Sequence, residues 1–235
     1  MISPLMPISE STIPELAFNH LARMEDPLGV FPRLTTKFFS LWLKTTYPFH
    51  SIGRDVLIHH TVVINRRVAP AISIGSSVMI RKDAWLNTFD IEDVKGPTIV
   101  IEDGCLIGAG DVISAKNRIH IERDVIIGKY VLMQDHNHAY EDLASPIKAQ
   151  GLTSGGRIRI EQGCWIGQGA AIVSNQDELV IGRNSVVASN ALVTKSCPPH
   201  SVLVGNPARL ARQYDPAKGA WVGGNGRSAS VSESA

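Results

Sequence analysis

Residues 119–133 read Ile-His-Ile-Glu-Arg-Asp-Val-Ile-Ile-Gly-Lys-Tyr-Val-Leu-Met, and this stretch decides the fold. A large apolar side chain returns every six positions, at Ile121, Ile127 and Met133. Four residues after each of the first two comes a smaller β-branched residue, Val125 and then Val131. A period of six fits neither an amphipathic helix nor a long alternating strand. It is typical of short strands joined by tight turns, three to a coil, as in a hexapeptide-repeat β-helix.

The same period extends over most of the chain. Six blocks of three large apolar positions are found: Ile52, Ile58, Ile64; Ile74, Ile80, Leu86; Ile101, Ile107, Ile113; Ile121, Ile127, Met133; Ile160, Ile166, Ile172; and Ile181, Val187, Val193. Fourteen of the 24 isoleucines fall on these 18 positions, a concentration that a chance choice of phase does not produce. The blocks predict an all-β protein whose core is a parallel β-helix of about six triangular coils. Residues between blocks are expected at a corner of the prism, where insertions cost little.

The cysteines fit the same pattern. Cys105 and Cys164 occupy the small inward position of their hexads, so we expect them to fill the core. A total of three widely spaced cysteines argues against a disulfide framework, and no pair has zinc-finger spacing. Glycine often follows the large apolar residue, which indicates turns that need a positive φ or a close backbone approach. These glycines are Gly53, Gly75, Gly108, Gly128, Gly167 and Gly182.

Composition and charge give no indication of a nucleic-acid-binding or membrane-spanning protein. The formal net charge is +1 and 44% of residues are apolar, as in an ordinary globular domain. No bulk electrostatic argument therefore points to nucleic acid. The first residues contain no signal peptide pattern, and the most apolar early stretch, Phe38 to Leu43, is too short to span a bilayer. We expect a cytoplasmic location without stable membrane insertion.

Both ends of the chain lack the repeat. Residues 1–50 are expected to form a partly helical N-terminal cap, with helices over 15–24 and 34–47 separated by Pro27 and Pro32. The favoured role of this segment is to cover the open end of the first coil. Surface attachment is the less favoured alternative, and it would use Phe38, Phe39, Leu41 and Trp42. After the repeat domain, residues 51–213, we expect a short C-terminal helix and a flexible Gly- and Ser-rich tail, residues 214–235.

One interruption of the repeat differs from the others. The inserted loop, residues 134–159, contains the run Asp135-His136-Asn137-His138-Ala139-Tyr140-Glu141-Asp142. Long loops inside a regular solenoid are usually functional. Two histidines, three carboxylates and a tyrosine in so short a run indicate a site for chemistry.

These features together resemble the hexapeptide-repeat O-acetyltransferases, the left-handed β-helix family that includes maltose and galactoside acetyltransferases. The resemblance rests on the hexads, on the histidine loop and on the closing Gly205-Asn206-Pro207-Ala208-Arg209. It is greatest to the polysaccharide-biosynthesis branch. It implies a left-handed helix, a homotrimer with its active site between adjacent prisms, acetyl-CoA as co-substrate, and no metal.

The resemblance also implies roles for residues in the loop. His136 is the expected general base, with His138 as the second choice or as a group that orients the acceptor. Asp135 or Glu141 would hold the imidazole in one tautomer. An imidazole with a pKa near 6.5 can take the proton of a sugar hydroxyl as that hydroxyl attacks a thioester directly, without a covalent enzyme intermediate.

Matching the last coils to the family gives a donor channel. A backbone N–H near Gln168 would stabilise the oxyanion, and cations would contact the phosphates at the far end of the donor. The residues implied for donor binding are Trp165, Gly167, Gln168, Ser189, Thr194, Lys195, Arg209 and Arg212. Both arginines are expected on one face of the short C-terminal helix.

Other functions remain open at this stage. The same fold serves N-acetyltransferases for amino-sugar nucleotides and serine acetyltransferases, so the fold does not determine the acceptor atom. A zinc carbonic anhydrase with His120, His136 and His138 as ligands, and a catalytically silent scaffold, are the weaker alternatives.

Overall fold

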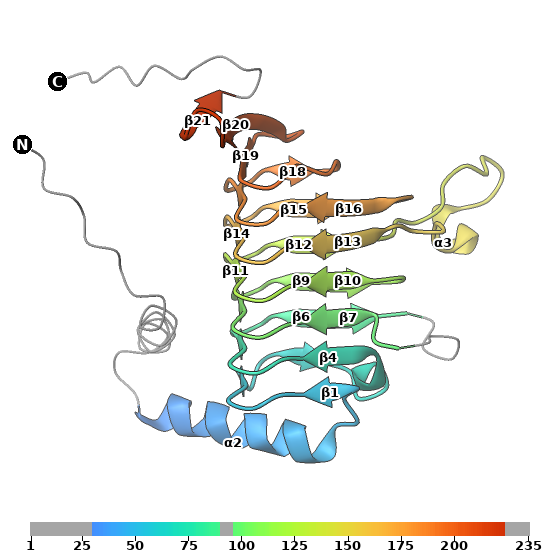
Figure 1. Cartoon of the computed structure of the whole chain (residues 1–235). Helices are drawn as coiled ribbons and strands as arrows, with labels where there is room; N and C mark the ends of the chain where they lie inside the picture. Colours follow the sequence, from blue (N-terminus) through green and yellow to red (C-terminus); the bar gives the residue numbers. More distant parts are fainter. Residues whose placement is uncertain (1–29, 90–95, 224–235) are drawn as a thin grey trace, which may run out of the picture.

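Eighteen short strands repeat in a fixed order along the chain and stack into three parallel sheets, which form the faces of a triangular prism (Figure 1). The computed structural model describes residues 30–89 and 96–223. Each group of three successive strands makes one coil, so β1 to β18 give six coils, as the hexads predict. The fold is therefore the predicted left-handed parallel β-helix.

We call the three faces sheets A, B and C. Sheet A contains β1 (Ser51–Ile52), β4 (Ile72–Ile74), β7 (Ile99–Ile101), β10 (Ile119–Ile121), β13 (Arg157–Ile160) and β16 (Glu178–Ile181). Sheet B contains β2 (Leu57–Ile58), β5 (Met79–Ile80), β8 (Leu106–Ile107), β11 (Ile126–Ile127), β14 (Trp165–Ile166) and β17 (Val186–Val187), and continues through β19 (Ser201–Val204), β20 (Arg209–Asp215) and β21 (Ala220–Gly223). Sheet C contains β3 (Val63–Ile64), β6 (Trp85–Thr88), β9 (Val112–Ala115), β12 (Leu132–Gln134), β15 (Ala171–Val173) and β18 (Leu192–Val193).

The core is the column of hexad side chains inside the prism. Seventeen of the 18 hexad positions are buried, and Ile52, the remaining one, packs against the core at the open end of the first coil. Cys105 and Cys164 lie in the same column, each 1% exposed. Burial raises the pKa of each of these thiols to about 12, so both are neutral core residues.

Insertions gather at one edge of the prism. We call the segments that join a sheet C strand to the next sheet A strand the C–A corner, and those that join sheet B to sheet C the B–C corner. The C–A corner carries the 3₁₀ helix η1 (Ala69–Ala71), and it carries the inserted loop with its helix α3 (Ile147–Gln150). The turns of the B–C corner keep a constant length, and in three of them a glycine packs closely on the next coil. A Cβ at Gly128 would lie 2.7 Å from the backbone nitrogen of Gln168.

The N-terminal cap is one helix, α2 (Val30–Thr46), which lies across the end of the first coil (Figure 1). It begins four residues earlier than predicted. Pro32 does not prevent this start, because it lies in the first turn, where no helical N–H bond is lost. Ser40 fixes the helix to the prism: its hydroxyl accepts a 2.8 Å bond from the N–H of Ile58. The helix predicted over 15–24 lies outside the described residues.

The predicted short C-terminal helix is wrong. Residues 209–215 form strand β20, which pairs antiparallel with β19 and with β21. The physical reason is the unpaired edge that β19 would otherwise expose at the end of sheet B. The predicted start of the tail at residue 214 is wrong as well, because ordered structure continues to Gly223.

Candidate active site

His136 lies in a buried position just after β12, at the start of the inserted loop. The residue is only 5% exposed, and its Nδ1 lies 3.0 Å from Oδ1 of Asp135. The ring of Phe89 packs edge-on against the imidazole at a centroid distance of 4.8 Å. The ring plane is therefore fixed from two sides.

Asp135 is fully buried, and three consecutive backbone N–H groups hold its carboxylate. Oδ1 accepts from Lys116 at 2.6 Å, and Oδ2 accepts from Asn117 and Arg118, each at 2.8 Å. Both oxygens of this carboxylate therefore act as hydrogen-bond acceptors. With Oδ1 as the acceptor, Nδ1 of His136 is the donor, which leaves the free lone pair on Nε2.

The same turn also ties down the loop at its far end. Lys116 Nζ donates to the carbonyl of Thr153 at 2.6 Å, and Asn117 Nδ2 donates to the carbonyls of Ser154 and Gly156 at 2.9 and 3.0 Å. Residues 116–118 thus hold both the beginning and the end of the inserted loop, and they keep His136 in a rigid frame.

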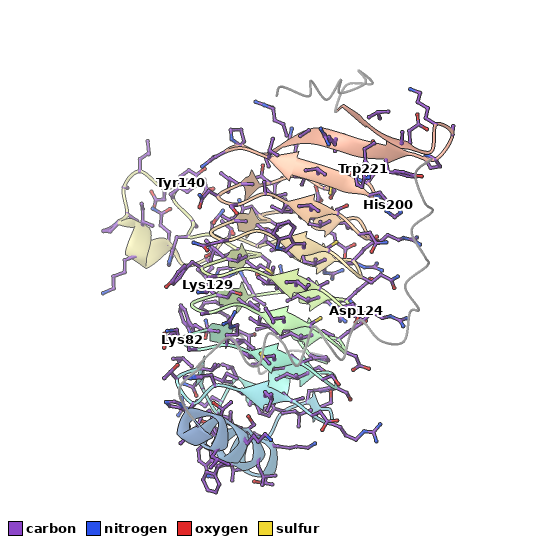
Figure 2. The ribbon with its side chains drawn as sticks, turned by 90° about the vertical axis from the view of Figure 1, so that its left-hand side faces the viewer. Lys82, Asp124, Lys129, Tyr140, His200 and Trp221 are labelled. Atoms are coloured by element: carbon purple, nitrogen blue, oxygen red, sulfur yellow. The ribbon has the colours of Figure 1, made fainter. Side chains whose placement is uncertain are left out.

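The other two predicted loop residues lie apart from this pair. His138 is exposed and forms an isolated β-bridge with Leu152. Glu141 is exposed, and its Oε2 accepts a 3.0 Å bond from the N–H of Tyr140, on the part of the loop that projects from the prism (Figure 2). The structure brings Asp135 to the imidazole and places Glu141 elsewhere.

The predicted donor groups around Gln168 lie on the other edge of sheet C, at the B–C corner. The N–H of Gln168 donates to no group among the described residues, and the residue is exposed. Gly167 packs directly on the next coil, where a Cβ would lie 2.6 Å from the backbone nitrogen of Ser189. Three of the predicted donor residues therefore lie on consecutive turns of one corner.

Arg209 and Arg212 share a face, as predicted, but on a strand. Arg209 pairs with Val204 and Arg212 with Val202, because an irregularity in the register between Val202 and Leu203 takes up one residue of β20. Cross-strand pairs lie on the same side of a sheet, so both arginines are on the outer face of sheet B. Trp165, 54% exposed, lies on this face too.

Thr194 and Lys195 lie on the opposite corner from Gln168. They follow β18 at the C–A corner and line a pocket with Asn175 and Glu178. Asn175 Oδ1 in turn accepts a 2.7 Å bond from the hydroxyl of Thr153 in the inserted loop. The predicted site residues therefore form two groups: one with His136 at the C–A corner, and one on sheet B and the B–C corner.

Sequence reasoning missed Phe89 and the turn 116–118. The signal was available in the hexad register, which pairs Asn87 with Ser114 and Ser114 with Gln134. Counting forward two residues on each strand places Phe89, Lys116 and His136 at corresponding positions of successive coils.

The proposed zinc ligands are not gathered in one chain. His120 lies in β10 of sheet A, and its Nε2 lies 2.7 Å from Oε1 of Glu102. Over residues 30–89 and 96–223, no group of three or more His, Cys, Asp or Glu side chains is arranged to hold a metal ion.

Comparison with known proteins agrees with the fold and the resemblance. No protein-family model matches the chain. It is 30% identical over 110 residues to the probable acetyltransferase Rv3034c of Mycobacterium tuberculosis, a match that covers 47% of this chain and 35% of that protein. It is 26% identical over 115 residues to the putative lipopolysaccharide biosynthesis O-acetyl transferase WbbJ of Escherichia coli, covering 46% of this chain and 57% of that protein.

Among solved structures, a variant of AntD, an N-acyltransferase from Bacillus cereus in complex with dTDP and coenzyme A, has a TM-score of 0.60. Its sequence identity is 20%, and the match covers 76% of this chain and 90% of that one, so this likeness concerns the fold alone. The matches to the two curated relatives span about a third and somewhat more than half of those proteins. The chain is thus similar, over about half of its length, to curated proteins named acetyltransferases, and it has the fold that this resemblance implied.

Proposed function

We propose that this protein transfers an acetyl group from acetyl-CoA to a hydroxyl of a sugar or polysaccharide precursor, with His136 as general base. The observation that carries the proposal is the buried Asp135–His136 pair, with an Nδ1–Oδ1 distance of 3.0 Å. Asp135 keeps the proton on Nδ1, so Nε2 is the atom that takes the proton from the acceptor hydroxyl as it attacks.

On the donor side, acetyl-CoA supplies an activated thioester. The N–H of Gln168, which donates to none of the described residues, is suited to donate a hydrogen bond to the carbonyl oxygen of that thioester as negative charge develops on it. Arg209 and Arg212, together on the outer face of sheet B, are suited to pair with phosphates. Trp165 offers an apolar surface beside them.

Within a single chain, His136 and Gln168 lie on opposite edges of sheet C. We therefore propose a homotrimer in which adjacent subunits share each site. Exposed apolar side chains support such packing. Val63 (56% exposed) pairs with Trp85 (43%) on sheet C, and Ile126 (45%) pairs with Trp165 (54%) on sheet B. Contiguous exposed apolar residues of this kind mark protein–protein interfaces.

The acceptor atom distinguishes this proposal from its alternative, N-acetylation of an amino-sugar nucleotide. The name of WbbJ favours oxygen, whereas AntD is an N-acyltransferase. Release of free thiol from acetyl-CoA, measured with matched sugars and amino sugars as acceptors, separates the two. Turnover only with the amino sugars would overturn O-acetylation.

Replacing His136 tests the mechanism. His136→Ala should lower kcat by roughly 10²–10⁴-fold, because the attacking hydroxyl loses its base. The exposed His138 makes the matched control, and His138→Ala should lower kcat much less. If His136→Ala folds with an unchanged circular dichroism spectrum and retains full kcat, the assignment of the base is wrong.

A further inference from the structure

Capping the prism occupies only one side of helix α2. Leu43, 2% exposed, and Phe39 pack against the first coil. Four further large apolar side chains point away from the prism: Leu34 (59% exposed), Phe38 (73%), Leu41 (60%) and Trp42 (44%). Their spacing of three and four residues puts them on one face of the helix, which we call the outer face of α2. No described residue covers it.

This outer face forms the end of the molecule. Helix α2 lies across the prism at the end opposite to β19, β20 and β21, so nothing described projects beyond it (Figure 1). A flat surface can therefore approach along the whole length of the helix without meeting the sheets or the inserted loop.

The charge of the chain is distributed unevenly toward this end. Residues 30–88 contain eight Lys or Arg and two Asp, a formal net charge of +6. Residues 96–193 contain eight Lys or Arg and eleven Asp or Glu, a net charge of −3, and residues 194–223 at the opposite end contain four Lys or Arg and one Asp, a net charge of +3. The end capped by α2 is thus the more basic of the two ends. Helix α2 contains no acidic residue, and Lys37 is exposed beside the apolar side chains. A basic end favours an anionic partner.

Aromatic rings add a third feature. Trp42 packs against Phe39 at 5.7 Å and against Tyr47 at 5.6 Å between ring centroids. Trp and Tyr prefer the boundary between apolar and aqueous phases, since each ring has an apolar body and a polar tip. The second half of α2 thus has the composition of an interfacial helix.

We infer that the outer face of α2 binds the surface of an anionic lipid bilayer, with the helix lying in the plane of the interface. Helices with Trp, Phe and Leu on one face and Lys beside them bind membranes in this way. The contact is peripheral, since none of the helices in the described part of the chain is long and apolar enough to span a bilayer. A second copy is a poorer occupant, because two such faces in contact would bring like charges together.

Vesicle co-sedimentation of the full-length protein tests the inference, and it does not depend on acetyl transfer. The protein should sediment with vesicles of equal parts phosphatidylcholine and phosphatidylglycerol, and a smaller fraction should sediment with pure phosphatidylcholine. High salt should reduce the fraction bound to the anionic vesicles. The double variant Phe38→Gln/Leu41→Gln should weaken binding by at least about tenfold, because two apolar side chains no longer insert. Leu143, 99% exposed on the inserted loop, gives the matched control: Leu143→Gln should bind like the parent protein.

Three results would overturn the inference. One is no sedimentation of the parent protein with anionic vesicles. Another is equal binding by the double variant and the Leu143→Gln control. The third is self-association without lipid that the double variant abolishes, which would identify a second copy as the occupant. An unchanged melting temperature shows that the double variant is folded.

Discussion

Two buried aspartates of this protein differ in the groups that contact their carboxylates. Asp135 accepts three backbone N–H bonds and contacts the imidazole of His136. Asp111, 1% exposed at the B–C corner, accepts bonds from the N–H groups of Gly108 (2.6 Å) and Val131 (2.8 Å). Burial dominates there and raises the pKa of Asp111 to about 7.

The raised pKa of Asp111 predicts a pH dependence of stability. Between the ordinary carboxyl pKa of 3.8 and the folded value of about 7, the folded chain holds a proton that the unfolded chain has lost. The free energy of unfolding should therefore fall as pH rises from 5 to 8, by about 3 kcal/mol from this residue alone. Denaturant unfolding at both pH values checks it. In the Asp111→Asn variant this loss of unfolding free energy between pH 5 and 8 should vanish. An equal loss in the two proteins would contradict the assignment.

At the scale of elements, the inserted loop is held by a short turn and not by a core of its own. Its helix α3 has no buried residue, and Leu143 near its tip is fully exposed. Three side-chain bonds from residues 116 and 117 fix its far end. Order in the loop thus depends on hydrogen bonds from the preceding coil, and the frame of His136 depends on them too.

Asn117→Ala should loosen this loop, since it removes two hydrogen bonds worth about 1 kcal/mol each. We expect faster chymotrypsin cleavage near Tyr140 and Leu143, with little change in the melting temperature, because the core is unaffected. Gln176→Ala is the control: this exposed residue lies at the same corner, and its side chain makes no hydrogen bond to the described loop residues. Equal cleavage rates in the two variants would show that Asn117 does not hold the loop.

For the whole molecule, the main finding is that sheet C separates His136 from Gln168 and the other donor residues predicted at the B–C corner, whereas Thr194 and Lys195 lie on the His136 side. His136 lies at one edge of that sheet, and Gln168 lies at the other. A site built from both groups thus needs two copies of the chain, in the arrangement proposed above.

Mixed assemblies test the shared site. We expect His136→Ala subunits and Arg209→Glu/Arg212→Glu subunits to be nearly inactive alone at limiting acetyl-CoA. Co-expressed in equal amounts, they should recover about one quarter of the parent activity, since a random cyclic trimer pairs an intact histidine with an intact donor face at that frequency. No recovery in assemblies verified to contain both subunits would place the whole site within one chain.

The sequence alone determined the prism. Its hexads gave six coils, and its breaks gave the corner with insertions, because a six-residue period reports directly which side chains point inward. It also offered Asp135 and Glu141 as the two carboxylates that could hold the imidazole of His136, and the structure places Asp135 against that ring.

Only the tertiary structure decided what depends on how coils stack. The N–H groups that hold Asp135 come from residues 116–118, one coil earlier, and Phe89 reaches His136 from two coils earlier. The strand β20 replaced the predicted helix because an open sheet edge favours pairing over local helix propensity. The placement of Gln168 and Ser189 on a separate corner from His136 follows from closure of the three sheets, which depends on contacts between residues far apart in the sequence.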